Sequence, residues 1–112
     1  MADMQPCTLK DVHYINCDIS QEKQVKNAVD LTLQKFGRID VALACAAIAG
    51  KGMLNPTMTK SGSINLEIVK KVMDVNFYGS LYLAKYSALA MAKNEKVDGE
   101  RGLILFVTSI AS

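Results

Sequence analysis

Hydrophobic residues along this chain alternate between short, mostly apolar runs and longer stretches with helical spacing. The apolar runs are Ile39–Cys45 and Leu103–Val107, and Val12–Cys17 has a strand-like composition. A short apolar run that ends in Gly or small polar residues is typical of a strand buried on both faces. We therefore expect three strands, with Ile39–Cys45 and Leu103–Ser109 adjacent, parallel and largely buried.

The first stretch with helical spacing predicts an amphipathic helix over Gln21–Phe36. Ser20 before it can cap the free backbone N–H groups of the first turn. Gly37 after it fits the C′ position, where a left-handed residue commonly ends a helix. Strand, helix and strand in this order predict a parallel pair joined by a right-handed crossover.

The second stretch with helical spacing follows Asn65, which is also a cap candidate, and continues to Met91. Gly79 near its middle predicts a kink. The segment Ala46–Ile64 is long for a connection in a compact domain, which favours a functional or mobile loop. Lys93–Arg101 is predicted to be a charged loop before the last strand.

The resulting order, β-α-β-loop-α-α-β, predicts one α/β domain with a parallel sheet over residues 1–112. The formal net charge of +2 and the absence of a basic stripe argue against nucleic-acid binding. No apolar run approaches the roughly 18 residues needed to cross a bilayer. The N-terminus lacks the features of a secretory signal or transit peptide. An intracellular location, cytoplasmic or mitochondrial, is expected.

The cysteines give no sign of a metal site or a disulfide framework. Cys7, Cys17 and Cys45 are scattered, odd in number and not spaced as C-x-x-C, which favours a reducing compartment. His13, the only histidine, stands at the start of a predicted strand, so we expect a structural role and no metal centre.

Five motifs resemble the short-chain dehydrogenase/reductase family, in the order and approximate spacing of that family. They are C-D-I-S at 17–20, F-G-R-I-D-V-A at 36–42, C-A-A-I-A at 45–49, M-D-V-N at 73–76 and G-L-I-L-F-V-T-S at 102–109. The resemblance extends to a branch that acts on 3-hydroxyacyl-CoA and hydroxysteroids. It implies a partial Rossmann-like, doubly wound sheet of about three strands with flanking helices.

The resemblance implies that Asp18 accepts a hydrogen bond from the adenine amino group and that the amide of Ile19 contacts the same ring. Cys45, Ala46 and Ala47 would pass beside the adenosine ribose. Without the resemblance, Asp18 is simply the start of a turn, and Cys45 is a small buried hydrophobic residue.

Two residues depart from the family pattern at positions 44–47, which usually reads Asn-Asn-Ala-Gly, or Asn-Cys-Ala-Gly in the branch that this chain resembles. Ala44 lacks the side-chain amide that would stabilise the central sheet. Ala47 adds a Cβ where glycine permits close approach or a positive φ.

The resemblance also implies two catalytic residues. Asn76 matches the asparagine that helps to hold a water linked to the catalytic lysine, and Ser109 matches the serine that positions the substrate oxygen. Thr108 is a lesser candidate than Ser109. The alternative for Asn76 is an asparagine that bends the helix and bonds to the backbone.

Two family motifs do not occur within these 112 residues, namely the glycine-rich T-G-x-x-x-G-x-G turn and the Tyr-x-x-x-Lys pair. None of the tyrosines, at 14, 78, 82 and 86, has a lysine four residues later. In strand order 3-2-1-4-5-6 the predicted strands would be numbers 3, 4 and 5. The first of them would then face a gap or pair differently.

Two functions fit these observations. The first is an NAD-linked oxidoreductase, with NADP as the other possible cofactor, that interconverts a hydroxyl and a ketone on a small-molecule substrate. The resemblance implies a homo-oligomer, charge and hydropathy predict no nucleic-acid or membrane partner, and the chain alone is expected to be inactive. The second is a non-catalytic scaffold or binding subunit derived from the same fold, which the substitutions at Ala44 and Ala47 favour.

Overall fold

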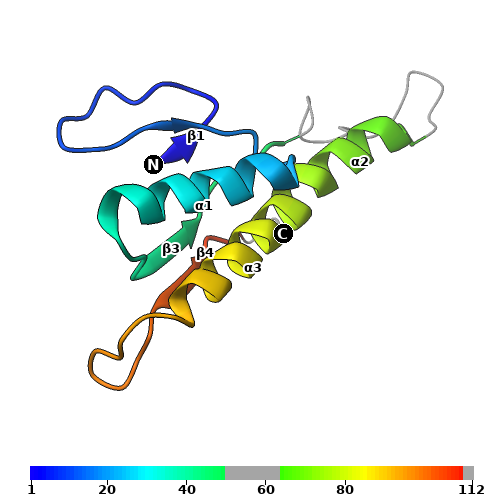
Figure 1. Ribbon diagram of the computed structural model, residues 1–112. Helices are drawn as coiled ribbons and strands as arrows, with labels where there is room; N and C mark the ends of the chain where they lie inside the picture. Colours follow the sequence, from blue (N-terminus) through cyan, green and yellow to red (C-terminus); the bar gives the residue numbers. More distant parts are fainter. Residues whose placement is uncertain (50–63, 110–112) are drawn as a thin grey trace.

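The computed structural model describes residues 1–49 and 64–109 (Figure 1). Its helical part includes a π-helical segment, η1, between two α-helices. The elements in chain order are β1 (Ala2–Asp3), β2 (Ile15–Asn16), α1 (Glu22–Phe36), β3 (Val41–Ala44), α2 (Leu66–Met73), η1 (Asp74–Gly79), α3 (Ser80–Met91) and β4 (Leu103–Phe106).

The four described strands form two separate, parallel, two-stranded sheets. β3 pairs with β4, with Val41 opposite Leu103 and Ala44 opposite Phe106. The predicted parallel pairing of these two segments is therefore confirmed, although each strand is shorter than expected. β1 pairs with β2 in the other sheet.

The strand β1 is a correction to the sequence interpretation, which assigned no structure to residues 1–11. The backbone N–H groups of Ile15 and Cys17 donate to the carbonyl oxygens of Met1 and Asp3, at 2.8 and 2.9 Å. The strand expected over Val12–Cys17 is reduced to Ile15–Asn16. A strand extends only as far as it has a hydrogen-bonding neighbour, and here that neighbour is two residues long.

Helix α1 follows the prediction at its C-terminus but not at its N-terminus. Gly37 has φ 82° and donates its N–H to the carbonyl of Leu33, as expected for a left-handed helix end. The N-cap position is Gln21, not Ser20. The Ser20 hydroxyl instead donates to the Asp18 carboxylate at 2.8 Å, so it does not cap the helix.

The second helical stretch begins as predicted, because the Asn65 side chain accepts from the N–H groups of Glu67 and Ile68 at 3.1 and 3.3 Å. The predicted kink at Gly79 is a π-helical turn that Gly79 ends. A Cβ on Gly79 would lie 2.8 Å from the Ile19 side chain, so glycine allows this close approach. Most of the predicted loop Ala46–Ile64 lies outside the described residues.

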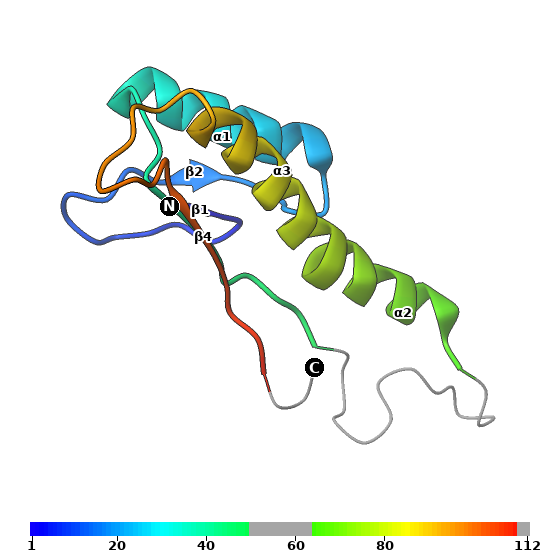
Figure 2. The same ribbon diagram turned by 90° about the horizontal axis from the view of Figure 1, so that it is seen from below.

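Helices α1 and α3 lie together on one side of the strands (Figure 2). The buried apolar residues form two clusters between these helices and the strands. One contains Val29, Ile39, Ala42, Ala90 and Met91, and the other contains Cys17, Val25 and Ala28.

The opposite face of the β3–β4 sheet is exposed, which corrects the expectation that both strands are largely buried. Val41, Leu43, Leu103 and Leu105 are between 44% and 58% exposed. Side chains alternate between the two faces of a strand. On the helix side Ala42 and Ala44 are buried and Ile104 is partly covered. None of the helices in residues 1–49 and 64–109 is long and apolar enough to cross a membrane.

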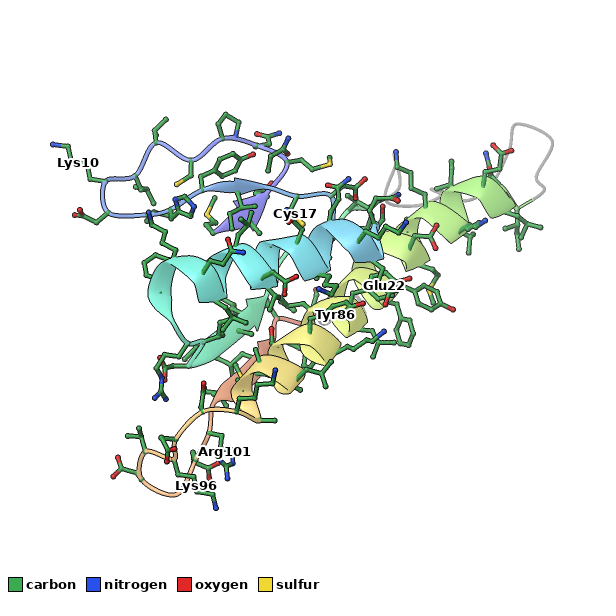
Figure 3. The ribbon with its side chains drawn as sticks, viewed as in Figure 1. Lys10, Cys17, Glu22, Tyr86, Lys96 and Arg101 are labelled. Atoms are coloured by element: carbon green, nitrogen blue, oxygen red, sulfur yellow. The ribbon has the colours of Figure 1, made fainter. Side chains whose placement is uncertain are left out.

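A polar contact ties the start of α1 to α3. The Glu22 carboxylate accepts from the Lys85 ammonium at 2.7 Å and from the Tyr86 hydroxyl at 2.9 Å (Figure 3). These donors hold the pKa of Glu22 below its ordinary value, the Lys85 bond having the largest effect. The same bond raises the pKa of Lys85.

Replacing Met91 should destabilise the fold far more than replacing Leu89 on the same helix. Met91 is 5% exposed within the core and Leu89 is 60% exposed. Met91→Ala should lower the free energy of unfolding by about 2–5 kcal/mol. Leu89→Ala should change it by about 0.5 kcal/mol or less. Urea unfolding followed by circular dichroism measures both, and equal losses would contradict the assigned core.

The Glu22 contact should make stability depend on pH in the acid range. Because the folded-state pKa is depressed, the stabilisation is present above the ordinary value of 4.5 and is lost as pH falls through the folded pKa. The Glu22→Gln variant should therefore lose less stability than the wild type below about pH 4.5. Urea midpoints across this range test the effect, with the exposed Glu95→Gln as control. Parallel profiles for wild type and Glu22→Gln would contradict it.

Candidate functional site

A cavity of about 520 Å³ lies between β1 and β3. Helices α1 and α3 form its floor through Val25, Ala28 and Leu83. Its rim includes residues at or just after the carboxyl ends of three strands. These rim residues are Asp3, Ile19, Cys45 and Ala46, with Gly79 and Ser80 beside them. The carboxyl edge of a parallel sheet is where such folds bind their ligands.

The predicted adenine-binding pair lies directly after β2. Asp18 is held by local hydrogen bonds, because its Oδ1 accepts from the N–H and hydroxyl of Ser20 at 3.0 and 2.8 Å. Its own N–H donates to the Gln24 side chain at 2.8 Å. Among the described residues, no donor contacts Oδ2 of Asp18. Ile19 lines the cavity, and Asp18 is not among the lining residues.

The predicted ribose-binding segment lies directly after β3. Cys45 and Ala46 line the cavity and are exposed, and Ala47 is exposed without lining it. Cys45 is therefore not a buried hydrophobic residue. Ala47 has no positive φ, so its backbone conformation is open to any residue. Ala44 is buried against the helices.

Asn76 lies in η1 and binds the backbone of Ile48, beyond the end of β3. Its Oδ1 accepts from the Ile48 N–H at 2.8 Å, and its Nδ2 donates to the Ile48 carbonyl at 2.9 Å. This pair of bonds joins the π-helical turn to the segment that carries the predicted ribose contacts. π-Helical turns inside α-helices often occur at functional sites.

Ser109 is exposed and follows β4, three residues beyond its last residue, Phe106. It is not among the residues that line the cavity between β1 and β3. Its predicted catalytic role, like that of Asn76, stays a prediction. The described structure thus groups Ile19, Cys45 and Ala46 in one cavity and links Asn76 to the adjacent loop.

Sequence reasoning missed Asp3, an acidic residue at the carboxyl end of β1 that lines the cavity. Its Oδ1 accepts from the Gln5 N–H at 3.1 Å. In dinucleotide-binding folds an acidic residue about 20 residues after the glycine-rich turn binds the ribose 2′-hydroxyl. The only signal in the sequence was an aspartate in a short polar segment. That segment does not predict a strand, because it becomes one only by pairing with β2.

Other reactive groups do not add to the site. Burial, and to a lesser degree the neighbouring Asp18, raises the pKa of the Cys17 thiol, which makes it a poor nucleophile at neutral pH. Within residues 1–49 and 64–109, no group of three His, Cys, Asp or Glu side chains is arranged to hold a metal ion.

Parallel strand pairs, a helical crossover and a cavity whose rim lies at the strands' carboxyl ends define an α/β domain with Rossmann-like topology. The family model described as "Enoyl-(Acyl carrier protein) reductase" matches residues 3–112. The chain belongs to this family, within the short-chain dehydrogenases/reductases.

Individual relatives agree with this assignment. The chain is 35% identical over 104 residues to "3-hydroxyacyl-CoA dehydrogenase type-2" of Bos taurus, covering 92% of this chain and 40% of the bovine protein. It superimposes on the ligand-free aldohexose dehydrogenase of Thermoplasma acidophilum with a TM-score of 0.74 at 20% identity, covering 96% and 38% of the two chains. An NAD⁺-bound xylitol dehydrogenase gives a TM-score of 0.68 at 21% identity, covering 88% and 34%. The chain thus spans about two fifths of the bovine relative.

Breaking the Asn76 contact should loosen the segment after β3. Asn76→Ala removes both bonds to Ile48, each worth about 0.5–1.5 kcal/mol. Exchange of the Ile48 amide hydrogen should accelerate by roughly two- to tenfold. Ser80→Ala, which removes a different exposed bond to the Asn76 carbonyl, is the control, and an unchanged Ile48 rate in Asn76→Ala would contradict the assignment.

Proposed function

We propose that this chain forms part of an NAD-linked oxidoreductase that interconverts a hydroxyl and a ketone. The observation that carries the proposal is the convergence of Asp3, Ile19 and Cys45 on one cavity. They lie at or just after the carboxyl ends of three different strands, the edge at which open α/β sheets bind their ligands. Family membership supports the same chemistry.

The polar groups at and near the cavity rim suit the adenosine half of a nicotinamide cofactor. A carboxylate at Asp3 accepts hydrogen bonds from a ribose diol but repels a 2′-phosphate, which favours NAD over NADP. Asp18 would accept from the adenine amino group, with the Ile19 amide beside the ring. Cys45 and Ala46 would line the ribose. When bound, the cofactor supplies the hydride acceptor.

A 3-hydroxyacyl-CoA or a hydroxysteroid-like alcohol is the proposed substrate class, supported by the name of the bovine relative. Ser109 would donate a hydrogen bond to the substrate oxygen, and Asn76 would fix the loop that borders the cofactor. A homo-oligomer is proposed on the same family grounds. The 112 residues hold neither a glycine-rich phosphate-binding turn nor a Tyr-x-x-x-Lys pair.

A non-catalytic scaffold is the second proposal, and Ala44 favours it. This residue is buried between the sheet and the helices, where the family usually has an asparagine amide. A methyl group there offers no hydrogen bond to the neighbouring backbone. A chain retained for binding alone would tolerate that loss.

The isolated chain should bind only the adenosine half of the cofactor, weakly, and should have no measurable dehydrogenase activity. Loss of a general acid/base alone costs roughly 10²–10⁴-fold in rate, and loss of cofactor positioning adds to this. Titration with AMP and then NAD, followed by ¹⁵N NMR, should shift the amides of Ile19, Cys45 and Ala46. An absorbance assay with NAD and a 3-hydroxyacyl-CoA should show no NADH.

The matched control is Asp3→Asn, which keeps the size of the side chain but removes its charge. It should reduce the preference for AMP over 2′-phospho-AMP. Shifts confined to the distant loop around Lys96 and Arg101 would contradict the assigned site. Micromolar NAD binding or clear NADH formation would show that other residues supply the phosphate contacts and the proton transfer. The scaffold proposal predicts no AMP-dependent shifts at the rim.

A further inference from the structure

Gly79, the buried residue that ends η1, is a glycine that its own backbone conformation does not require. Its φ of −57° and ψ of −45° are ordinary right-handed helical values that any residue adopts. Alanine is favoured over glycine inside a helix, because glycine loses more backbone freedom on folding. The reason for a glycine at this position must therefore lie in what surrounds it.

The surroundings of Gly79 leave no room for a side chain. An added Cβ would lie 2.8 Å from both Cγ1 and Cδ1 of Ile19 and 3.0 Å from the Ile19 carbonyl oxygen. Carbon atoms pack favourably at about 3.5–4.0 Å, so a methyl group here would push the Ile19 side chain away by about 0.7 Å or more. A change of rotamer would not relieve the contact with the carbonyl oxygen, because that atom belongs to the backbone.

The Ile19 side chain is held in place by its other neighbours. It packs against the buried cluster of Cys17, Val25 and Ala28. Overpacking such a cluster forces backbone shifts. The turn that carries Ile19 is also tied to α1, because the Asp18 N–H donates to the Gln24 side chain at 2.8 Å. A Cβ on Gly79 would therefore move the backbone of Ile19, its N–H included.

The segment that ends at Gly79 also holds the chain after β3. Asn76 of η1 binds both backbone polar groups of Ile48, whereas Gly79 contacts Ile19 after β2. Ile19 and Gly79 both line the cavity. One helical segment thus fixes the chain just after two different strands, at the edge where open α/β sheets bind their ligands.

We propose that Gly79 is a positioning residue for nucleotide binding, because the close approach that it permits sets where the Ile19 amide meets the adenine ring. The inference rests on the proposed oxidoreductase function, in which that amide contacts the ring. Binding groups have to be held within about 0.5 Å of the productive geometry. The displacement of about 0.7 Å that follows from the carbon contact distance exceeds this tolerance. Gly79 acts through Ile19 and offers no side chain to the nucleotide.

The test measures AMP affinity by ¹⁵N NMR on the whole chain, with Gly79→Ala introduced into the wild type, Ile19→Val and Ile19→Ala. In the wild type it should shift the Ile19 amide resonance without ligand and weaken AMP binding roughly two- to tenfold, the worth of one hydrogen bond. The penalty should shrink as Ile19 is trimmed. In Ile19→Ala it should fall below about twofold, because the Cγ1 and Cδ1 contacts are gone. The Val and Ala backgrounds decide the matter if Gly79→Ala alone does not fold.

Gly102→Ala is the matched control, because it introduces the same kind of clash away from the cavity. Its Cβ would lie 2.5 and 2.6 Å from Sδ and Cγ of Met91, a core residue. Gly102 precedes β4 and does not line the cavity. This variant should unfold at a lower urea concentration and keep the AMP affinity of the wild type.

Three results would overturn the inference and leave the proposed function standing. The first is unchanged AMP affinity in Gly79→Ala, and the second is an equal penalty in every Ile19 background. The third is an equal loss of affinity in Gly102→Ala, which would indicate general destabilisation. A wild-type chain without AMP-dependent shifts at Ile19, Cys45 and Ala46 would refute the proposed function and the inference together.

Discussion

The contact between helices α1 and α3 is the interaction on which the rest of the described structure depends. The two sheets share no hydrogen-bonded strand pair, so only the helical layer fixes one against the other. Val25 and Ala28 of α1 pack with Cys17 at the end of β2, and Val29 of α1 packs with Ile39 and Met91. The hydrogen bonds from Lys85 and Tyr86 to Glu22 fix the relative position of the two helices along their axes, which apolar packing alone does not fix.

This arrangement leaves the sheet edges and one sheet face uncovered. A doubly wound sheet normally carries helices on both faces, but the described helices cover one. Val41 and Leu43 are therefore exposed although they belong to an apolar strand. The separation of the two sheets also leaves the cavity between them. The exposed sheet edges and the candidate site therefore have the same origin in the topology.

The sequence predicted those features that depend on local chemistry. The cap at Asn65, the left-handed end at Gly37 and the parallel pairing of β3 with β4 all follow from residue type and spacing. Burial of both strand faces failed as a prediction, because periodicity reports what a strand could bury and not whether a covering layer is present. β1 could not be foreseen either, since two residues carry no periodicity and Ala2 and Asp3 are a strand only through β2.

The sequence could predict those parts of the candidate site whose backbone position is fixed by a recognisable motif. Cys45 and Ala46 line the cavity, and the ribose contact that the resemblance implies for them stays a prediction, whereas Asp3 had no motif to identify it. Asn76 shows why residue identity alone is ambiguous, since its amide satisfies both polar groups of Ile48. The π-helical turn directs Asn76 toward the segment after β3, and an amide held there fixes that segment whichever function the chain serves.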